Sequence, residues 1–322
     1  MNRKGKGYIY IFTIILISLL ALFFYFIYSY ISNASYINLN RVEKIQSKYA
    51  AESLLNIKIS ENDFNEELGN FIFSNEEYRN LNCEFKPKDT EVKKLELRKR
   101  NYVNKDGIDV DLVELKADAK YKNSIAGAKI MANYVNKIYK EEDGVLNSGK
   151  VNKDDLEKIR NFFNENNWSK GDNRVLNLDG DFFYGIEKGK KFIFEEVEVY
   201  DENLRENVKK RKPLYLLDNV DVIIQKSGTL NIETGINNQI LLINNKVLFN
   251  DNAISGIIIL NDNAEIFNNC KLEGYLINLY DKNSGISVKY KPQVFEKFGS
   301  VLPEYIKFQP ISLNYYDIED NT

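Results

Sequence analysis

The amino-acid sequence predicts a mainly β protein with a long N-terminal transmembrane α-helix, a small antiparallel α+β head and a parallel β-solenoid of about 3–4 turns. Two observations predict this fold: an apolar run without charge near the N-terminus, and an 18-residue repeat between residues 214 and 290. The expected segments are 1–60 for the leader, membrane span and extended helix, 61–213 for the head, 214–290 for the solenoid and 291–322 for a C-terminal tail.

The N-terminal apolar run has the length of a membrane span. Tyr8 to Ile31 is 24 residues without a charged side chain, and a helix of that length is about 36 Å long, against a hydrocarbon core of about 30 Å. Arg3, Lys4 and Lys6 precede it, which predicts a cytoplasmic N-terminus and an exported head. A secretory signal cleaved at Ser32-Asn33-Ala34 is the alternative, but its apolar region is typically only about 7–15 residues long.

The helix is expected to continue beyond the membrane. No proline or glycine interrupts the chain from Tyr8 to Ser60, and Val42, Ile45, Tyr49 and the pair Leu54-Leu55 recur at helical spacing. A helix of about 50 residues is about 75 Å long. We expect its first half in lipid and the apolar stripe of its second half packed on the head.

Between the long helix and the repeat, the pattern changes to strands. Alternating apolar residues predict an antiparallel sheet from Phe71 to about Tyr139, which would pack on the long helix. Within it, residues 104–107 have the composition of a hairpin turn. Residues 122–127 are expected to join strands over 113–121 and 128–139.

A helix and a second strand region are expected before the repeat. Residues 154–164 carry apolar side chains at helical spacing, behind Asn152 or Asp154 as the N-cap. Strand patterning returns over 182–200, and the basic run 209–213 closes the head. We interpret that run as a solvated linker, with a basic contact patch as the alternative.

The 18-residue repeat predicts the solenoid. Three apolar columns advance in step, which indicates three faces per turn, each turn covering the one before it. Asn, Asp, Gly and Ser lie between the columns, and these residues form corners readily. Spacings of roughly seven, six and five residues within a turn favour a right-handed coil, and the handedness itself stays open. The expected core residues are Ile223, Leu241, Ile259 and Ile277 in the first column, Leu230, Leu248 and Ile266 in the second, and Ile236, Ile254 and Leu272 in the third.

Composition excludes several kinds of site. The chain has no histidine, which removes the commonest general base and transition-metal ligand and rules out Ser-His-Asp and Cys-His arrangements. We expect no cofactor and no metal. A net charge of −3 gives no sign of a nucleic-acid partner. Cys83 and Cys270 are either two free thiols or one disulfide, and both alternatives stay open.

Some acidic and aromatic residues are of types that form binding or catalytic sites, but their pattern does not favour such sites. Asp109-Val110-Asp111 and Asp179-Gly180-Asp181 lack the spacing of a calcium loop, and we interpret them as turn or strand-edge acids. Trp168, the one tryptophan, is expected in a core or an interface, with a sugar-binding platform as the alternative. No two solenoid acids stack in one column as an acid/base pair for polysaccharide cleavage would. These acids are Asp218, Asp221, Glu233, Asp251, Asp262, Glu265 and Glu273.

The two ends of the chain resemble a known family. A short basic leader ending in glycine, Arg3-Lys4-Gly5-Lys6-Gly7, precedes the aromatic-aliphatic stretch from Tyr8, as in class III signals of type IV pilins. Tyr49-Ala50-Ala51-Glu52-Ser53 is similar to the signature that follows the membrane helix of PilX-type minor pilins, and residues 288–295 resemble the end of pilin-like proteins. The chain therefore resembles a type IV pilus minor-pilin-like or PilX-type pilus assembly protein.

The resemblance implies processing and assembly. A prepilin peptidase would cut after Gly7, so that the mature chain begins at Tyr8, and cleavage after Gly5 is the alternative. Phe12 and Ala50-Ala51-Glu52 would take part in packing of the long helix with other pilins and pilus-assembly proteins. Major pilins have a glutamate at the fifth mature position, where an ionisable group in lipid normally signals function. In this chain the position is Phe12, which favours a minor subunit.

We therefore expect a minor-pilin-like component of a type IV pilus or related assembly or secretion machine. It would cross the cell membrane once, through residues 8–31, with its N-terminus in the cytoplasm and a non-catalytic head outside. One alternative is an anchored surface scaffold or adhesin with an uncleaved helix. Another is a β-helix enzyme acting on surface polysaccharide, which the few turns and the absence of histidine and paired acids disfavour.

Overall fold

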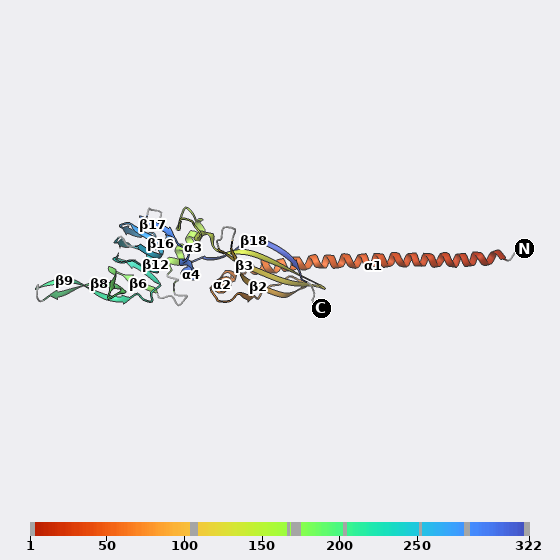
Figure 1. Ribbon diagram of the computed structural model, residues 1–322, viewed down its shortest axis with the longest axis horizontal. Helices are drawn as coiled ribbons and strands as arrows, with labels where there is room; N and C mark the ends of the chain where they lie inside the picture. The colour runs from red at the N-terminus through yellow and green to blue at the C-terminus, as the bar shows by residue number, and fades with distance from the viewer. Residues whose placement is uncertain are drawn as a thin grey trace. The chain divides into compact units, whose positions relative to one another are not determined.

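In the computed structural model the chain divides into two units (Figure 1). The structure describes residues 4–103, 109–165, 168, 175–201, 205–250, 253–279 and 284–318. Unit 1 comprises residues 1–133 and 310–322, and unit 2 comprises residues 134–309. Unit 2 is therefore inserted into unit 1. This division differs from the expected one, because the tail returns to the head and the strands expected at the end of the head belong to unit 2.

Unit 1 consists of a long helix, a short helix and a sheet. The long helix is continuous, as predicted, and its 57 residues correspond to about 85 Å. The sheet has the strand order β1-β2-β3-β4-β18, and the pairs from β1 to β4 are antiparallel. The elements are α1 (Lys4–Ser60), α2 (Phe64–Ile72), β1 (Tyr78–Asn80), β2 (Thr90–Val103), β3 (Asp109–Tyr121), β4 (Ser124–Val135) and β18 (Ile306–Asp317).

One face of this sheet is apolar and packs against α1, which lies mainly on β3. Ala117 pairs with Ala128, and Ala119 pairs with Ala126; all four are fully buried, as is Ala51 of α1. Small side chains on both surfaces let the helix backbone approach the sheet closely. The other buried apolar residues of unit 1 include Leu54, Leu55, Phe64, Leu68, Phe71, Leu95, Leu97, Val113, Leu115 and Ile130.

The connection between β3 and β4 is shorter than predicted. Tyr121 pairs with Ser124, so the turn is the two residues Lys122-Asn123, with φ of 51° at Lys122. Strand β4 therefore begins earlier than expected, because its first residues are small and lack the bulky apolar pattern of a strand. The hairpin turn predicted at 104–107 lies outside the described residues.

Unit 2 contains a parallel β-solenoid of about four turns, as predicted. It is preceded by a short helical region and followed by another. In chain order the elements are η1 (Lys137–Tyr139), β5 (Val145–Asn147), α3 (Lys153–Asn164), β6 (Val175–Asp179), β7 (Phe182–Glu187), β8 (Lys190–Asp201), β9 (Glu206–Leu216), β10 (Val222–Ser227), β11 (Thr229–Ile232), β12 (Asn237–Ile243), β13 (Lys246–Phe249), β14 (Ala253–Leu260), β15 (Glu265–Phe267), β16 (Cys270–Asn278), β17 (Ile286–Tyr290), α4 (Val294–Phe298) and η3 (Gly299–Val301).

The coils stack in two sheets (Figure 1). One has the order β17-β16-β14-β12-β10-β6, with β5 also paired to β16, and the other has the order β15-β13-β11-β7-β8-β9. Strand β16 serves two faces, because Cys270–Gly274 pair with β17 and Leu276–Asn278 pair with β5. Gly274 and its partner Gly256 have φ of 158° and 136°, which mark the corner between these faces. Each turn thus has three faces.

The solenoid begins before the expected boundary at residue 214. Strand β6 pairs in parallel with β10, and β7 with β11, so both belong to the first coil. The basic run 209–213 lies in β9, opposite β8, and is not a linker. The 18-residue spacing does not predict the first coil, because the long β8–β9 hairpin interrupts the spacing there.

The first predicted column mixes two faces of a sheet. Ile223 pairs with Leu241, but Leu241 pairs with Ile258, only 17 residues further on, because β12 contains a bulge. A shift of one residue moves every following side chain to the other face. Ile223, Leu241 and Ile258 therefore lie in the coil interior, whereas the predicted members Ile259 and Ile277 lie on the outer face of the same sheet.

The second column is also corrected at one position. Leu230 pairs with Val247, which pairs with Ile266, so the interior position of that coil belongs to Val247. The predicted Leu248 is paired with Asn231 and is only half-buried. The third column keeps its spacing and is buried in the interior throughout, at Ile236, Ile254 and Leu272.

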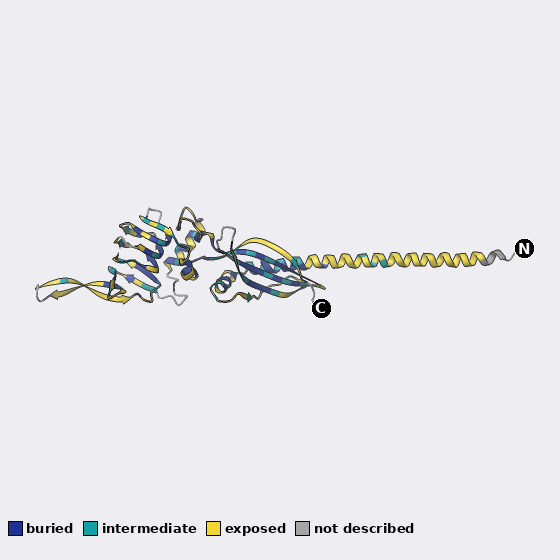
Figure 2. Ribbon diagram, viewed as in Figure 1, coloured by how far each residue is buried: buried dark blue, intermediate teal, exposed yellow. Residues whose placement is uncertain are grey.

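The sheet containing β10, β12, β14 and β16 is buried on both faces (Figure 2). Strands buried on both faces carry continuous apolar runs, and the last four residues of β14 are such a run. The outer face is covered by an aromatic group in which the Tyr139 ring lies 6.0 Å from that of Tyr275 and 5.7 Å from that of Phe295. Trp168 is buried in the same core, stacked on Phe163.

Candidate functional site

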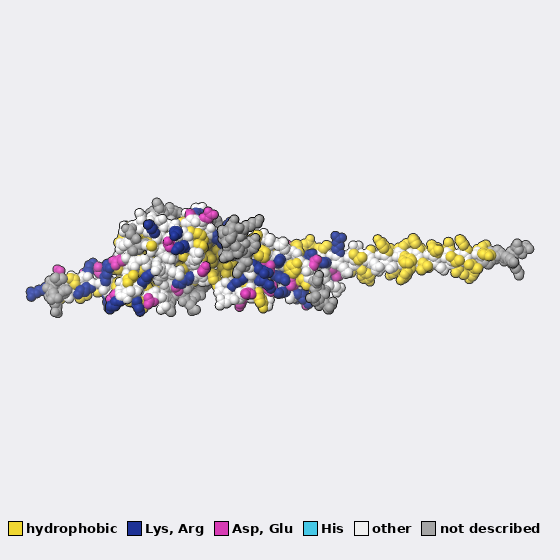
Figure 3. All heavy atoms as spheres, in the orientation of Figure 1, with side chains coloured by type: hydrophobic (Ala, Val, Ile, Leu, Met, Phe, Trp, Pro, Cys, Tyr) yellow, Lys and Arg dark blue, Asp and Glu magenta, His cyan; other side chains and the backbone are white. Residues whose placement is uncertain are grey.

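Helix α1 is, among the described residues, the one helix long and apolar enough to cross a membrane. Its apolar first part is exposed (Figures 2 and 3), with the Tyr8 side chain 81% and the Phe12 side chain 67% accessible. Nothing in unit 1 covers this surface within the described residues. An apolar helix with no protein partner fits a hydrocarbon environment, in which all backbone groups are satisfied within the helix.

The second half of α1 has two different sides. The side toward the head contains Glu43, Ser47 and Ala50, followed by Ala51 and the two leucines, and it is buried. The prediction that the apolar stripe of this segment packs on the head was therefore wrong for most of the stripe. The head instead accepts small and polar residues, because the helix lies close to an alanine-rich sheet.

The opposite side of α1 carries an exposed apolar stripe. It consists of Leu39, Val42, Ile45 and Tyr49, whose side chains are all more than two-fifths exposed. At 100° per residue these four lie within an arc of about 120°, whose centre is about 145° from the centre of the buried side. We call these four residues the free stripe. They lie beyond the 24-residue apolar run Tyr8–Ile31.

The residues expected to act in processing and assembly are all on α1. Gly7 lies inside the helix, which begins at Lys4, and Tyr8 and Phe12 are in the exposed apolar part. Ala50 and Ala51 are buried inside unit 1, so they serve packing of the head and not contacts between copies. Glu52 accepts a hydrogen bond of 2.5 Å from the hydroxyl of Tyr315 on β18.

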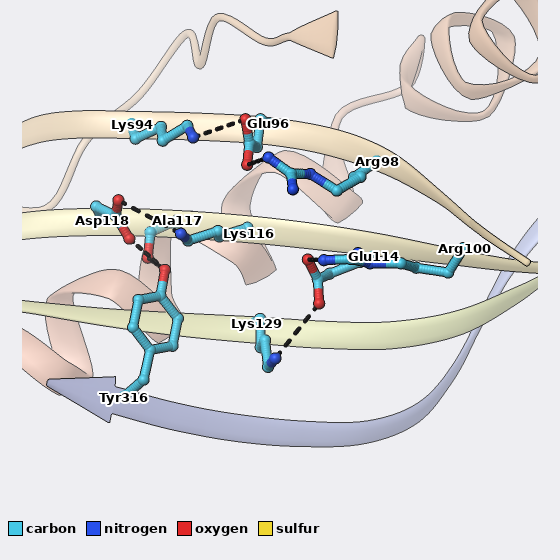
Figure 4. Close-up of polar contacts among 10 residues, drawn as sticks. All are labelled: Lys94, Glu96, Arg98, Arg100, Glu114, Lys116, Ala117, Asp118, Lys129 and Tyr316. Atoms are coloured by element: carbon cyan, nitrogen blue, oxygen red, sulfur yellow. Dashed lines mark hydrogen bonds and ion pairs between the residues drawn. The ribbon is translucent and has the colours of Figure 1, made fainter. Parts of the chain in front are cut away.

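The face of the sheet turned away from α1 is charged (Figure 4). Because side chains alternate along a strand, the even-numbered residues of β3, and those of β2 from Lys94 onward, lie on this face. The two acids in its middle are buried under the stems of longer basic side chains. The residues of this charged face are Lys94, Glu96, Arg98 and Arg100 of β2, Glu114, Lys116 and Asp118 of β3, and Lys129 of β4.

Each of the two buried acids is held between two bases. The Glu96 carboxylate is 2.8 Å from the ammonium of Lys94 and 3.2 Å from the guanidinium of Arg98. The Glu114 carboxylate is 2.7 Å from Arg100 and 3.4 Å from Lys129. A buried charge is stable only when it is paired in this way. The bases remain partly exposed, so this face presents an array of paired charges.

Tyr316 joins β18 to the charged face. Its ring lies over Gly127, where a Cβ atom would come within 2.1 Å of the ring. Its hydroxyl donates to the carboxylate of Asp118, and the Lys116 ammonium is 4.8 Å from the ring centre. Sequence reasoning did not find this contact. The glycine inside a strand was its one available signal, because such a glycine often marks a close approach by another group.

The charged face predicts that unit 1 loses stability in acid. Burial raises the pKa of the Glu114 carboxyl, but the Arg100 hydrogen bond and the charges of Arg100 and Lys129 outweigh this and lower the pKa below its ordinary 4.5. A carboxyl with a lowered folded pKa stabilises the fold above its unfolded pKa and loses that contribution as pH falls through the folded value.

We therefore expect hydrogen-exchange protection factors of β2 to β4, corrected for intrinsic exchange, to fall between about pH 5 and pH 3. Glu114→Gln should make the decline shallower. Glu66→Gln, a change at an exposed carboxyl in the same unit, is the matched control and should leave it unchanged. Equal declines in the natural chain, in Glu114→Gln and in Glu66→Gln would contradict the view that the Glu114 ion pairs cause the loss of stability in acid.

A second buried charge lies where α1 ends. The Lys58 ammonium is 2.6 Å from Glu61 and 2.7 Å from Glu67, and its side chain is only 4% exposed. Burial lowers the pKa of Lys58, but the two carboxylates outweigh this and raise it. An open pocket of about 560 Å³ adjoins this cluster, lined also by Arg79 and Cys83. The ion pair of Lys58 with Glu67 connects the end of α1 to α2.

Neither thiol is in a disulfide, and the two aspartates of one candidate calcium site are engaged in hydrogen bonds. Cys83 and Cys270 are both free, and burial in the coil raises the pKa of Cys270 to about 12. Asp179 accepts from the Ser227 hydroxyl and Asp181 from the Thr229 amide, which ties neighbouring coils together. The side chains of Asp109 and Asp111 lie outside the described residues. Within those residues no group of three or more Cys, Asp or Glu side chains is arranged to hold a metal ion.

The solenoid acids are paired with bases and not with one another. Six of the seven are in the described part of the chain, and each lies within 4.0 Å of a lysine or arginine. Asp251 lies outside it. Two free carboxyls facing a substrate are what glycoside hydrolysis requires. The pairs are Asp218–Lys190, Asp221–Lys297, Glu233–Arg211, Asp262–Arg160, Glu265–Lys246 and Glu273–Lys289.

Comparisons with family models, with curated proteins and with solved structures found no match. The functional argument therefore depends on the geometry of this chain. Its most informative surface is helix α1, with an apolar first part and a free stripe beyond it.

Proposed function

We propose that the chain is a minor-pilin-like subunit of a type IV pilus or a related assembly or secretion machine, and that it displays a non-catalytic head outside the cell. The observation that carries this proposal is the free stripe of α1. It extends the apolar surface of the helix past the membrane, on the side opposite the head.

A simple anchor does not need this surface. A span requires about 20 residues, whereas α1 has 57 and continues as one helix into the head. Leu39, Val42, Ile45 and Tyr49 would face water in an isolated chain, which costs free energy unless another apolar surface covers them. In a bundle of such helices, the free stripe of each helix would pack on neighbouring helices, and the heads would point outward.

The rest of the chain is compatible with display. The basic residues before Tyr8 favour a cytoplasmic N-terminus, so that unit 2 and the part of unit 1 that follows the apolar run are exported. The acids of the charged face and of the solenoid are engaged with bases, which favours a head that binds or spaces over one that catalyses. Partners of the helix would be other pilins and pilus-assembly proteins.

The test is a single lysine on the free stripe. Val42→Lys places a charge in the proposed helix interface, whereas Asn40→Lys adds the same charge to an exposed position about 200° away around the helix. In cells that make the fibre, we expect Val42→Lys to reduce the amount of this protein in sheared fibres at least tenfold. The reason is that the lysine would bury one unpaired charge in the helix interface. Asn40→Lys should leave that amount within twofold.

Determining the N-terminal residue of the protein, both in the sheared fibres and in the cells that remain, completes the experiment. A mature start at Tyr8 together with loss of Val42→Lys from fibres supports the proposal. An intact Met1, or equal behaviour of the two lysine variants, would replace it with an uncleaved surface scaffold. A start at Ser35 would make the chain a secreted protein and overturn membrane assembly.

A further inference from the structure

The β8–β9 hairpin of unit 2 extends beyond the coils as a two-stranded ribbon (Figure 1). Strand β7 pairs with β8 only up to Phe194, so the outer part of β8, residues 195–201, has β9 on one side and no described strand on the other. Strand β9 is the last strand of its sheet. The described side chains of both strands in this outer part are exposed on both faces, with Val197 and Val208 half-buried.

The two free edges carry opposite charge. The outer part of β8 contains Glu195, Glu196 and Glu198, and the facing part of β9 contains the basic run 209–212. Glu195 is paired with Lys212, and the two acids that follow are opposite other bases. Each of these three glutamates therefore has a basic residue opposite it on the β9 side only.

The base of the ribbon is fixed to the coil. The Arg211 guanidinium is 2.5 Å from the Glu233 carboxylate and lies 4.1 Å from the centre of the Phe183 ring. The direction of the ribbon is therefore set by the coil. A hairpin of two uncovered strands is only marginally stable in water, and a third strand would stabilise it.

We propose that ribbons of two copies of this chain pair edge to edge, with β9 of one copy along the outer part of β8 of the next. In the resulting sheet, acidic and basic strands alternate. If the two copies have the same orientation, the new pair is antiparallel, like the β8–β9 pair itself.

The charges exclude the other pairings. Joining two β8 edges would put glutamates beside glutamates, and joining two β9 edges would put lysines beside lysines; like charges across a strand pair are destabilising. Pairing β9 with β8 joins two different surfaces and leaves a free edge at each end. Such a contact can be repeated along a row of copies. This inference does not depend on the proposed role of α1.

The test exchanges the charges of the two edges. The swapped chain carries Glu195→Lys, Glu196→Lys and Glu198→Lys together with Lys209→Glu, Lys210→Glu and Lys212→Glu; Arg211 is kept because it fixes the ribbon. Opposite charges are kept between positions 195 and 212, 198 and 209, and 196 and 209, so that the hairpin can form; only position 196 gains a like charge, from Arg211 opposite it. Full-length natural and swapped chains, each with two different tags, are mixed in detergent micelles at low salt, and recovery of the second tag on the first is measured.

We expect natural chains to recover natural chains, and swapped chains to recover swapped chains, about tenfold better than either recovers the other. The preference should disappear at about 1 M salt, where charges are screened within about 3 Å. Association through α1 would recover all combinations equally, so it raises the background without producing a preference.

Two outcomes would overturn the inference. Better recovery of mixed pairs than of like pairs would mean that identical edges meet. No preference at any salt concentration would mean that the lysines of β9 serve to prevent edge pairing, which is a common use of lysine on exposed strands.

Discussion

Replacing Gly274 with alanine is expected to destabilise the solenoid by about 3 kcal/mol or more. A Cβ atom at this position would lie 1.8 Å from the carbonyl oxygen of Gly256, and one at Gly256 would lie 2.1 Å from that of Gln239. The opposing atoms belong to the backbone, so no side chain can turn away to make room. The φ of 158° at Gly274 adds backbone strain for any other residue.

Trp168 provides the measurement. It is the one tryptophan of the chain and is buried in unit 2, so its fluorescence during urea unfolding reports on that unit. Gly189→Ala is the control, because Gly189 has φ of 80° but open space around its Cβ, and it should cost only about 1–2 kcal/mol. If Gly274→Ala lowered the urea midpoint no more than Gly189→Ala, close coil contact at the corner would not be what requires glycine.

Replacing Lys58 with methionine is expected to destabilise unit 1 by about 3–5 kcal/mol, the usual cost of leaving a buried charge without its partner. The substitution keeps the length of the side chain but leaves the Glu61 and Glu67 carboxylates facing each other around an apolar group. Hydrogen exchange of α2 and of the end of α1, measured by mass spectrometry at pH 7, should be accelerated accordingly. Exchange in the coils of unit 2 should be unchanged.

The matched control removes the remaining charges. Adding Glu61→Gln and Glu67→Gln to Lys58→Met should restore most of the lost protection, because a neutral polar cluster has no uncompensated charge. Full protection in the single variant would show that the carboxylates are solvated and that the ion pairs contribute little, as surface pairs do.

The sequence predicted the elements that repeat or that are long. The absence of proline and glycine from 8 to 60 predicted one continuous helix, and the 18-residue spacing predicted coils with three faces. The register could not be predicted, because a bulge in β12 changes one step from 18 to 17 residues and exchanges interior for exterior. Pairing of β6 and β7 with the coils could not be predicted for a similar reason, because the β8–β9 hairpin after β7 interrupts the 18-residue spacing.

The sequence predicted which residues form the apolar stripe of α1, but not the direction in which the stripe faces. Helical spacing identified Val42, Ile45 and Tyr49 as one side of α1, and the assumption that an apolar side faces its own head was wrong. The head-facing side contains Ser47 and Glu43, both buried, because close contact with an alanine-rich sheet selects for size as much as for polarity. The Tyr316 contact depends on residues 198 positions apart, which a local pattern does not contain.

The insertion of unit 2 into unit 1 has a consequence for the order of folding. During synthesis, β1 to β4 appear first, and β4 presents an open edge until β18 arrives after residue 305. The ends of unit 2 are fastened together, since the Asn136 amide donates to the Tyr305 carbonyl at 2.9 Å and its side chain donates to the Glu304 carbonyl. Completion of the solenoid thereby shortens the loop that must close before β18 can add to β4, so the coils act as a folding aid for the head.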